Sequence, residues 1–121
     1  MFERRHADRF LVPGATLRVF QNGDVSENFS VKDMTKSSVR FEIKASIIKG
    51  EEIKVELNIP EMEPFTLKGH VVWAVDPNLQ DKASAVIQFL PFGTDERYNS
   101  IECYEQLSRV VDKYSISIQN P

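Results

Sequence analysis

The sequence predicts a mostly β fold, a six-stranded antiparallel β-barrel followed by a C-terminal α-helix. Three observations predict this class. Apolar and polar residues alternate with a period of two over most of the chain, which is typical of strands with one buried face. Turn-forming residues interrupt the alternation about every 10 residues, a spacing that favours a small barrel. Near the C-terminus the apolar residues instead recur every three or four positions, which indicates a helix.

Six segments carry the alternating pattern. They are about 15–21, 26–33, 38–43, 52–59, 65–75 and 83–90. Asn22-Gly23-Asp24 separates the first two, because Asn and Gly adopt positive φ at little cost and favour a hairpin turn. Pro60 and Pro64 bracket a turn before the fifth strand, and Asp76-Pro77-Asn78 ends that strand.

The phase of the alternation predicts which side chains are buried. Trp73 falls in the apolar phase of its strand, so we expect it to pack in the core rather than to stack on a ligand. His70 falls in the opposite phase and is expected to point outward. The carboxylates of Glu42, Glu52 and Glu56 alternate with apolar residues, which is typical of a solvated outer face rather than of acid–base catalysis.

A helix is predicted over about 95–113. Thr94 is the expected N-cap, and Asp95 and Glu96 then lie in the first turn, where the helix dipole favours acidic side chains. The apolar stripe is narrow, so we expect the helix to pack on one end or one side of the barrel. The stripe consists of Ile101, Tyr104, Leu107, Val111 and Tyr114.

Length and charge restrict the class of protein. The 121 residues suit one domain, which we divide into a basic N-terminal arm (1–14), the barrel with its helix (15–114) and a tail (115–121). The net charge of −3 disfavours DNA or RNA as a partner. A single cysteine, Cys103, fits a reducing compartment. Because there is no apolar leader and no apolar run of membrane-spanning length, we expect a cytoplasmic protein without a membrane span.

Residues that carry out catalysis are scarce. The chain has two histidines, His6 and His70, and one cysteine, too few and too scattered for a structural zinc site. Phosphate-binding glycine loops and nucleophile motifs are absent from the sequence. The sequence therefore predicts that the protein is not an enzyme and that it has no catalytic residues, no metal and no cofactor.

The N-terminal arm concentrates positive charge in an acidic protein. Residues 1–20 hold four arginines against two acidic residues, a local charge of +2. Arg5 and Arg9 are four positions apart and Arg4 precedes them, in a segment without a helix or strand pattern. A solvated basic arm would look the same. Guanidinium groups also pair with phosphate oxygens and with the O6/N7 edge of guanine, and they stack on purines.

A second candidate segment, 33–38, lies between the second and third predicted strands. Asp33 offers two acceptor oxygens for the N1–H and N2–H donors of guanine, and Thr35 offers a hydroxyl for a phosphate or a base edge. An ordinary turn explains the same residues, because Asp, Thr and Ser all bond their own backbone in turns. Taken alone, this segment leaves both interpretations open.

Together these segments resemble a PilZ domain over about residues 2–111. Arg5 and Arg9 match the family's R-x-x-x-R motif, and Arg4 matches the arginine that often precedes it. The family also has a C-terminal helix at the corresponding place. Two further segments are similar to the strands that close the family's six-stranded barrel, 68–73 and 85–89.

The family's second motif, [D/N]-x-S-x-x-G, resembles the segment that starts at Asp33. Thr35 keeps a hydroxyl where Ser is usual, and Ser38 stands where Gly is usual. If that position requires positive φ, the serine costs on the order of 1 kcal/mol and weakens binding roughly tenfold. A competing register starts at Asn28. We prefer the Asp33 register, because the alternating strand 38–43 follows it at once, as it does in the family.

The resemblance implies a receptor for cyclic di-GMP, a bacterial second messenger. In PilZ domains the arginines of the arm hold phosphate and guanine, and the second motif holds a base from the barrel surface. The arm would be mobile without the ligand, fold onto the barrel when it binds, and so change a surface that a protein partner recognises, for instance in motility control. The alternative is a ligand-free PilZ-like interaction module of pilus or flagellar machinery. The ligand-binding residues implied here are Arg5, Arg9, Asp33 and Thr35, with Arg4 and Ser38 as further candidates.

Overall fold

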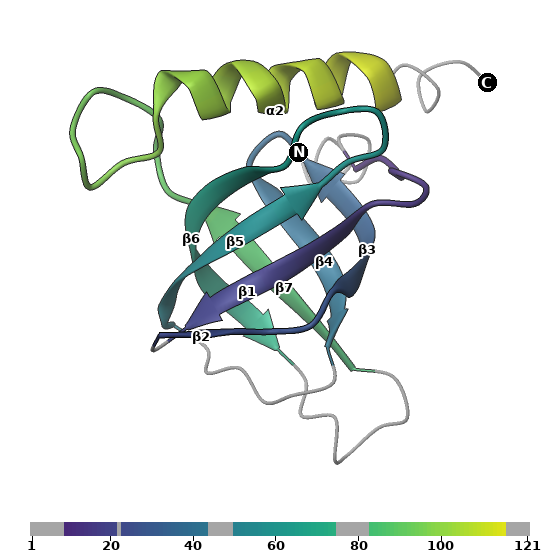
Figure 1. Cartoon of the computed structure of the whole chain (residues 1–121), viewed down its shortest axis with the longest axis horizontal. Helices are drawn as coiled ribbons and strands as arrows, with labels where there is room; N and C mark the ends of the chain where they lie inside the picture. The colour runs from purple at the N-terminus through teal and green to yellow at the C-terminus, as the bar shows by residue number, and fades with distance from the viewer. Residues whose placement is uncertain (1–8, 22, 44–49, 75–82, 116–121) are drawn as a thin grey trace, which may run out of the picture.

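The computed structural model describes residues 9–21, 23–43, 50–74 and 83–115. Arg4 and Arg5 of the predicted site lie outside these ranges. The described chain consists of strands, one helix and their connections (Figure 1). The elements are β1 Thr16–Gln21, β2 Asp24–Val25, β3 Phe29–Thr35, β4 Ser38–Ile43, β5 Glu52–Asn58, β6 Phe65–Ala74, β7 Ala83–Phe89 and α2 Ile101–Tyr114.

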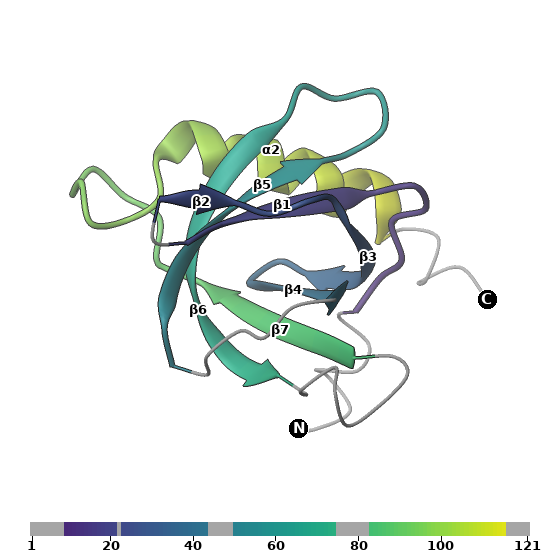
Figure 2. The same ribbon diagram turned by 60° about the horizontal axis from the view of Figure 1, so that its bottom comes forward.

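The strands form a closed antiparallel barrel, as the sequence predicted. The sheet runs in the order β2-β1-β3-β4-β7-β6-β5, and pairing of β1 with β5 closes it. Strand β2 pairs with the end of β1, and β3 pairs with the beginning of β1. Strand β2 is therefore an addition to the six strands of the barrel. Figure 2 shows the strands wrapping around a common interior, with α2 outside them. The predicted mostly β class, with six barrel strands and one C-terminal helix, is therefore confirmed.

Alternate side chains of the strands fill the interior of the barrel. In β4 the inward side chains Val39 and Phe41 are fully buried, and in β5 Val55 and Leu57 are fully buried. Burial of each such side chain stabilises the fold by about 1.5–3 kcal/mol, so the period-two pattern is the main reason why these segments become strands. Arg40, between the two core residues of β4, faces outward and is half-buried.

A β-bulge changes the phase of β6 near its end. Val71 lies opposite Ile87 of β7, but the next residue of β7, Val86, lies opposite Trp73. One residue of β6 is therefore unpaired, and the side chains beyond it exchange faces. Trp73 is 46% exposed, so the prediction that it packs in the core is wrong. His70 precedes the bulge and is exposed, as predicted.

The helix begins six residues later than predicted, at Ile101 rather than Asp95. Ser100 is the N-cap, and its side chain accepts a hydrogen bond from the backbone N–H of Cys103. The expected first turn around Asp95 is a bend, because the Asp95 carboxylate accepts a bond from the Arg97 N–H at 2.9 Å. The buried Asn99 holds the connection in place through bonds to the backbone of β6 and of the segment after β7.

Helix α2 covers one end of the barrel, as predicted (Figure 1). Leu107 and Val110 are its buried residues. The predicted stripe is correct only in part, because Ile101 and Tyr104 are 47% and 52% exposed. Neither α2 nor any other helix of the described ranges has the length and hydropathy that a membrane crossing requires.

Candidate functional site

The second motif segment belongs mostly to a tight β-hairpin. Asp33 and Thr35 are residues of β3, and Ser38 is the first residue of β4. Only Lys36 and Ser37 form the turn, because Thr35 and Ser38 are already paired across the hairpin. The interpretation of 33–38 as one turn is therefore wrong, because residues 33–35 and Ser38 belong to the strands. The hairpin fixes its polar side chains on two hydrogen-bonded strands.

A second β-bulge determines where Asp33 points. Val31 lies opposite Phe41, and the next pair across the hairpin is Asp33 with Arg40. The extra residue, Lys32, shifts the phase of β3, so Asp33 falls on the outer face while Met34 enters the core. In an unbroken strand Asp33 would lie on the same face as Val31 and point inward. The bulge thus places a carboxylate directly across from an arginine.

The end of the arm packs against β3. The Phe10 N–H donates to the Met34 carbonyl and the Met34 N–H donates to the Phe10 carbonyl, each at 2.9 Å. The Phe10 side chain is 1% exposed and Val12 is 2% exposed, so both belong to the core. Residues 9–14 are packed on the barrel rather than free of it. This contact brings Arg9 to the hairpin.

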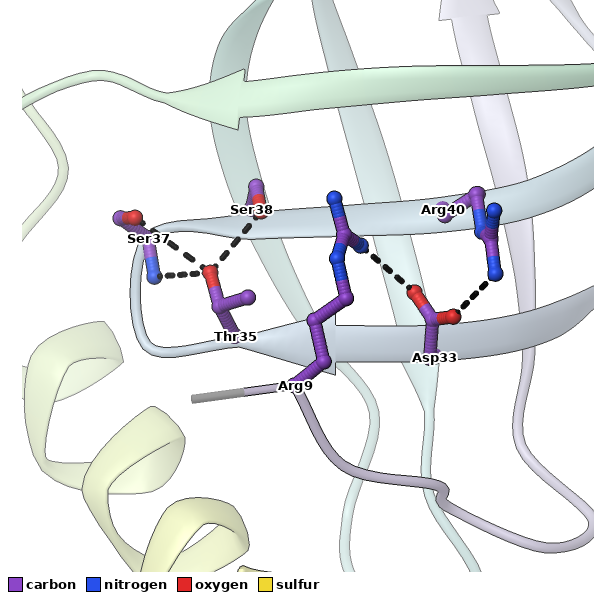
Figure 3. A network of polar contacts seen from close by, with 6 residues as sticks. All are labelled: Arg9, Asp33, Thr35, Ser37, Ser38 and Arg40. Atoms are coloured by element: carbon purple, nitrogen blue, oxygen red, sulfur yellow. Dashed lines mark hydrogen bonds and ion pairs between the residues drawn. The ribbon is translucent and has the colours of Figure 1, made fainter. Parts of the chain in front are cut away.

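Two arginines bind the carboxylate of Asp33 (Figure 3). Arg9 Nη1 donates to Oδ1 at 2.9 Å, and Arg40 Nη2 donates to Oδ2 at 2.5 Å. The Asp33 side chain is 9% exposed, whereas those of Arg9 and Arg40 are 39% and 41% exposed. We call these three residues the Asp33 centre. Two guanidinium groups and one carboxylate give the centre a formal charge of +1 in a protein whose net charge is −3.

Hydroxyl groups gather at the turn beside the Asp33 centre (Figure 3). Thr35 Oγ1 lies 2.8 Å from Ser38 Oγ and accepts a bond from the Ser37 N–H at 3.1 Å. Ser38 is in regular strand geometry, and the one described non-glycine residue with positive φ is Glu61. The replacement of Gly by Ser therefore causes no backbone strain here, contrary to the cost that we considered from the sequence.

The predicted site residues that the structure describes fall into two contacting groups. Arg9 contacts Asp33, and Thr35 contacts Ser38 two positions further along the hairpin. Sequence reasoning missed Arg40. The alternation of 38–43 did indicate that Arg40 faces outward, but its partner depends on the bulge in β3, which the pattern does not reveal.

The Asp33 centre lies outside the groove that adjoins the hairpin turn. This groove of about 490 Å³ lies beyond the turn, between the hairpin, the end of β7 and α2. Lys36 and Ser37 line it, but Arg9, Asp33 and Arg40 do not. Within the described ranges, no three His, Cys, Asp or Glu side chains are placed to hold a metal ion. The chemistry that the centre offers is recognition: guanidinium donors for anions, and carboxylate oxygens for paired N–H groups.

Solved structures of other proteins share this fold. The Bacillus subtilis inhibitor of motility (MotI/DgrA) superposes with a TM-score of 0.62 and 9% identity, over 87% of this chain and 48% of the other. An uncharacterized Legionella protein superposes with a TM-score of 0.52 and 14% identity, over 87% of this chain and 95% of the other. This chain therefore spans about half the length of the motility inhibitor. At these identities the similarity shows the fold alone. No family model and no curated protein matches the chain.

Proposed function

We propose that the protein is a PilZ-type effector that binds cyclic di-GMP at the Asp33 centre and signals to a protein partner. The observation that carries this proposal is the bond between Arg9 and Asp33. These residues are 24 positions apart and come from the two segments that resemble the two family motifs. A basic segment and a carboxylate meet on one face of a barrel of the expected class.

The chemistry of the centre suits a ligand that carries both guanine and phosphate. The Asp33 carboxylate accepts from the N1–H and N2–H groups of guanine, and the Arg9 guanidinium donates to phosphate oxygens. Because Arg9 already bonds Asp33, ligand entry exchanges that bond for new ones. The segment that follows Arg9 is bonded to β3, so the exchange reorients the Arg9 side chain and changes the surface offered to a protein partner at this place.

Titration calorimetry with cyclic di-GMP tests the proposal. We expect Arg9→Ala and Asp33→Asn each to weaken binding about 10- to 100-fold, because a hydrogen bond to a charged group contributes about 1.5–3 kcal/mol. Arg5→Ala tests the arginine of the arm that lies outside the described residues. Arg18→Ala is the matched control, since Arg18 is as exposed as Arg9 but bonds Glu56 on a different pair of strands, β1 and β5.

Cyclic di-AMP distinguishes recognition of guanine from recognition of phosphate. Adenine carries an acceptor at N1, so it does not pair with the Asp33 carboxylate as guanine does. We expect clearly weaker binding of cyclic di-AMP to the wild type, and little difference between the two nucleotides in Asp33→Asn. Equal binding of cyclic di-GMP by the wild type and the Arg9 and Asp33 variants contradicts the proposed site.

A second candidate function is a PilZ-like interaction module that binds no nucleotide, as in pilus or flagellar machinery. One observation favours it: both oxygens of Asp33 already accept bonds from arginines, which is sufficient for a purely structural ion pair. One protein of the same fold is named as an inhibitor of motility. A flat titration of the wild type with cyclic di-GMP, with a cooperative thermal unfolding transition, supports this function instead.

A further inference from the structure

Arg40 has hydrogen-bonding capacity that the structure does not use. Its Nη2 donates to Asp33, but its Nε is buried and has no hydrogen-bond partner among the described residues. A buried donor without an acceptor costs free energy, so a ligand that supplies an acceptor to this guanidinium recovers part of that cost. The side chain is nevertheless 41% exposed, so a ligand can reach the guanidinium.

Strand pairing on both sides holds the backbone of Arg40 in position. Arg40 lies opposite Asp33 of β3 and opposite Val86 of β7. Arg9, in contrast, belongs to a segment attached to β3 through the bridge between Phe10 and Met34. A guanidinium on a doubly paired strand loses little backbone freedom when it binds a ligand, which favours binding.

A guanine bound to Asp33 would compete with Arg40. The guanine edge uses both carboxylate oxygens, and Oδ2 now accepts the bond from Arg40. An arginine displaced from Oδ2 keeps its charge and requires new acceptors. The non-bridging oxygens of a phosphate match the planar fork of a guanidinium.

We propose that Arg40 is a further ligand-binding residue, whose guanidinium moves from Asp33 to a phosphate of the ligand when guanine takes the carboxylate. This inference rests on the proposed binding of cyclic di-GMP. It adds to the site a residue that lies in neither motif segment, and it gives Arg40 two partners in turn. Asp33 is the acceptor for Arg40 before binding, and the phosphate is its acceptor afterwards.

Calorimetric titration of Arg40 variants with cyclic di-GMP tests the inference. We expect Arg40→Ala and Arg40→Gln to weaken binding about tenfold or more, because a charged hydrogen bond is lost. Arg40→Lys keeps the charge without the fork, so an intermediate loss is expected. Arg18→Ala is the control, with 40% exposure of its side chain against 41% for Arg40. We expect it to bind within about twofold of the wild type. Thermal unfolding checks that each variant is folded.

The dependence of binding on salt separates ligand contact from positioning of Asp33. Salt screens the attraction between Arg40 and a phosphate, so affinity of Arg40→Gln should fall less steeply with salt than that of the wild type. A residue that only positions Asp33 weakens binding by the same factor at every salt concentration, and that result overturns the inference. Unchanged or tighter binding by Arg40→Gln also overturns it and leaves the proposed function standing. No binding by the wild type overturns both.

Discussion

Two arginine–carboxylate pairs on the outer face of the barrel have the same strand geometry but different surroundings. Arg40 lies directly across from Asp33 on β4 and β3, and Arg18 lies directly across from Glu56 on β1 and β5. The side chains of the two arginines are equally exposed, at 41% and 40%. Their carboxylates differ, because Asp33 is 9% exposed and Glu56 is 28% exposed. Asp33 also binds a second arginine, Arg9.

The difference shows how a common ion pair becomes a candidate binding site. A half-exposed cross-strand pair such as Arg18 with Glu56 contributes about 0.2–1 kcal/mol and has no excess charge. At Asp33 the arm adds a second guanidinium and the bulge in β3 sets the direction of the carboxylate. The result is a defined geometry with an excess positive charge. The arm and the bulge, rather than the barrel itself, therefore make the site.

The largest effect is expected when the side chain that anchors the arm to the barrel is removed. Phe10 is 1% exposed in the core, so Phe10→Ala should destabilise the protein by about 3–5 kcal/mol, from lost burial and the cavity left behind. Leu11 is the matched control, since it is 63% exposed and Leu11→Ala should change stability by about 0.5 kcal/mol or less. Urea unfolding measures both. Equal effects of the two substitutions would mean that the arm does not pack as described.

A smaller effect separates the two carboxylates directly. Asp33→Ala removes the acceptor of two charged bonds, and we expect a loss of about 1.5–3 kcal/mol in the free energy of unfolding. The half-exposed arginines can regain water, which keeps the loss below that of a fully buried pair. Glu56→Ala should cost about 0.2–1 kcal/mol. Urea unfolding at equal ionic strength compares them, and a loss at Glu56 as large as that at Asp33 would remove the distinction between the two regions.

Regular alternation made the strands of the barrel predictable, and its interruptions caused the errors. The pattern from Val39 to Ile43 in β4 has no interruption, and each inward residue there is buried. In β6 one bulge moves Trp73 to the surface. A bulge depends on how two strands pair over several residues, so the sequence of one strand does not reveal it. The same kind of error affected the helix start, where Asp95 bonds its own loop and Ser100 caps the helix.

The candidate site was predictable to the extent that it depends on residue chemistry. Arg9 and Asp33 were identified from side-chain type and from their resemblance to two motifs, and the structure brings them into contact. Arg40 required tertiary information, because its pairing with Asp33 follows from the bulge between Val31 and Asp33. The expectation of backbone strain at Ser38 was wrong for a related reason. Hairpin pairing gives this residue ordinary strand geometry, so a glycine is not needed there.

A third ion pair extends the comparison to a fully solvated carboxylate and gives the smallest expected effect. Lys113 Nζ donates to Glu61 Oε1 at 2.9 Å, and the Glu61 side chain is 81% exposed. The hydrogen bond from Lys113, with its charge, lowers the pKa of Glu61 below the ordinary value of 4.5. Lys113→Ala should return this pKa toward that value, as measured by NMR titration of the carboxyl carbon. Lys54→Ala, which removes an exposed lysine of β5, is the control and should leave it unchanged.

The sign of the stability effect follows from the lowered pKa of Glu61. A carboxyl group with a lower pKa in the folded state stabilises the protein above its unfolded pKa, and this stabilisation is lost as pH falls through the folded pKa. The difference in stability between the wild type and Lys113→Ala should therefore be small at neutral pH and disappear in acid. Urea unfolding as a function of pH measures it. If instead the difference exceeds that between the wild type and Asp33→Ala, burial of the carboxylate does not determine the strength of these pairs.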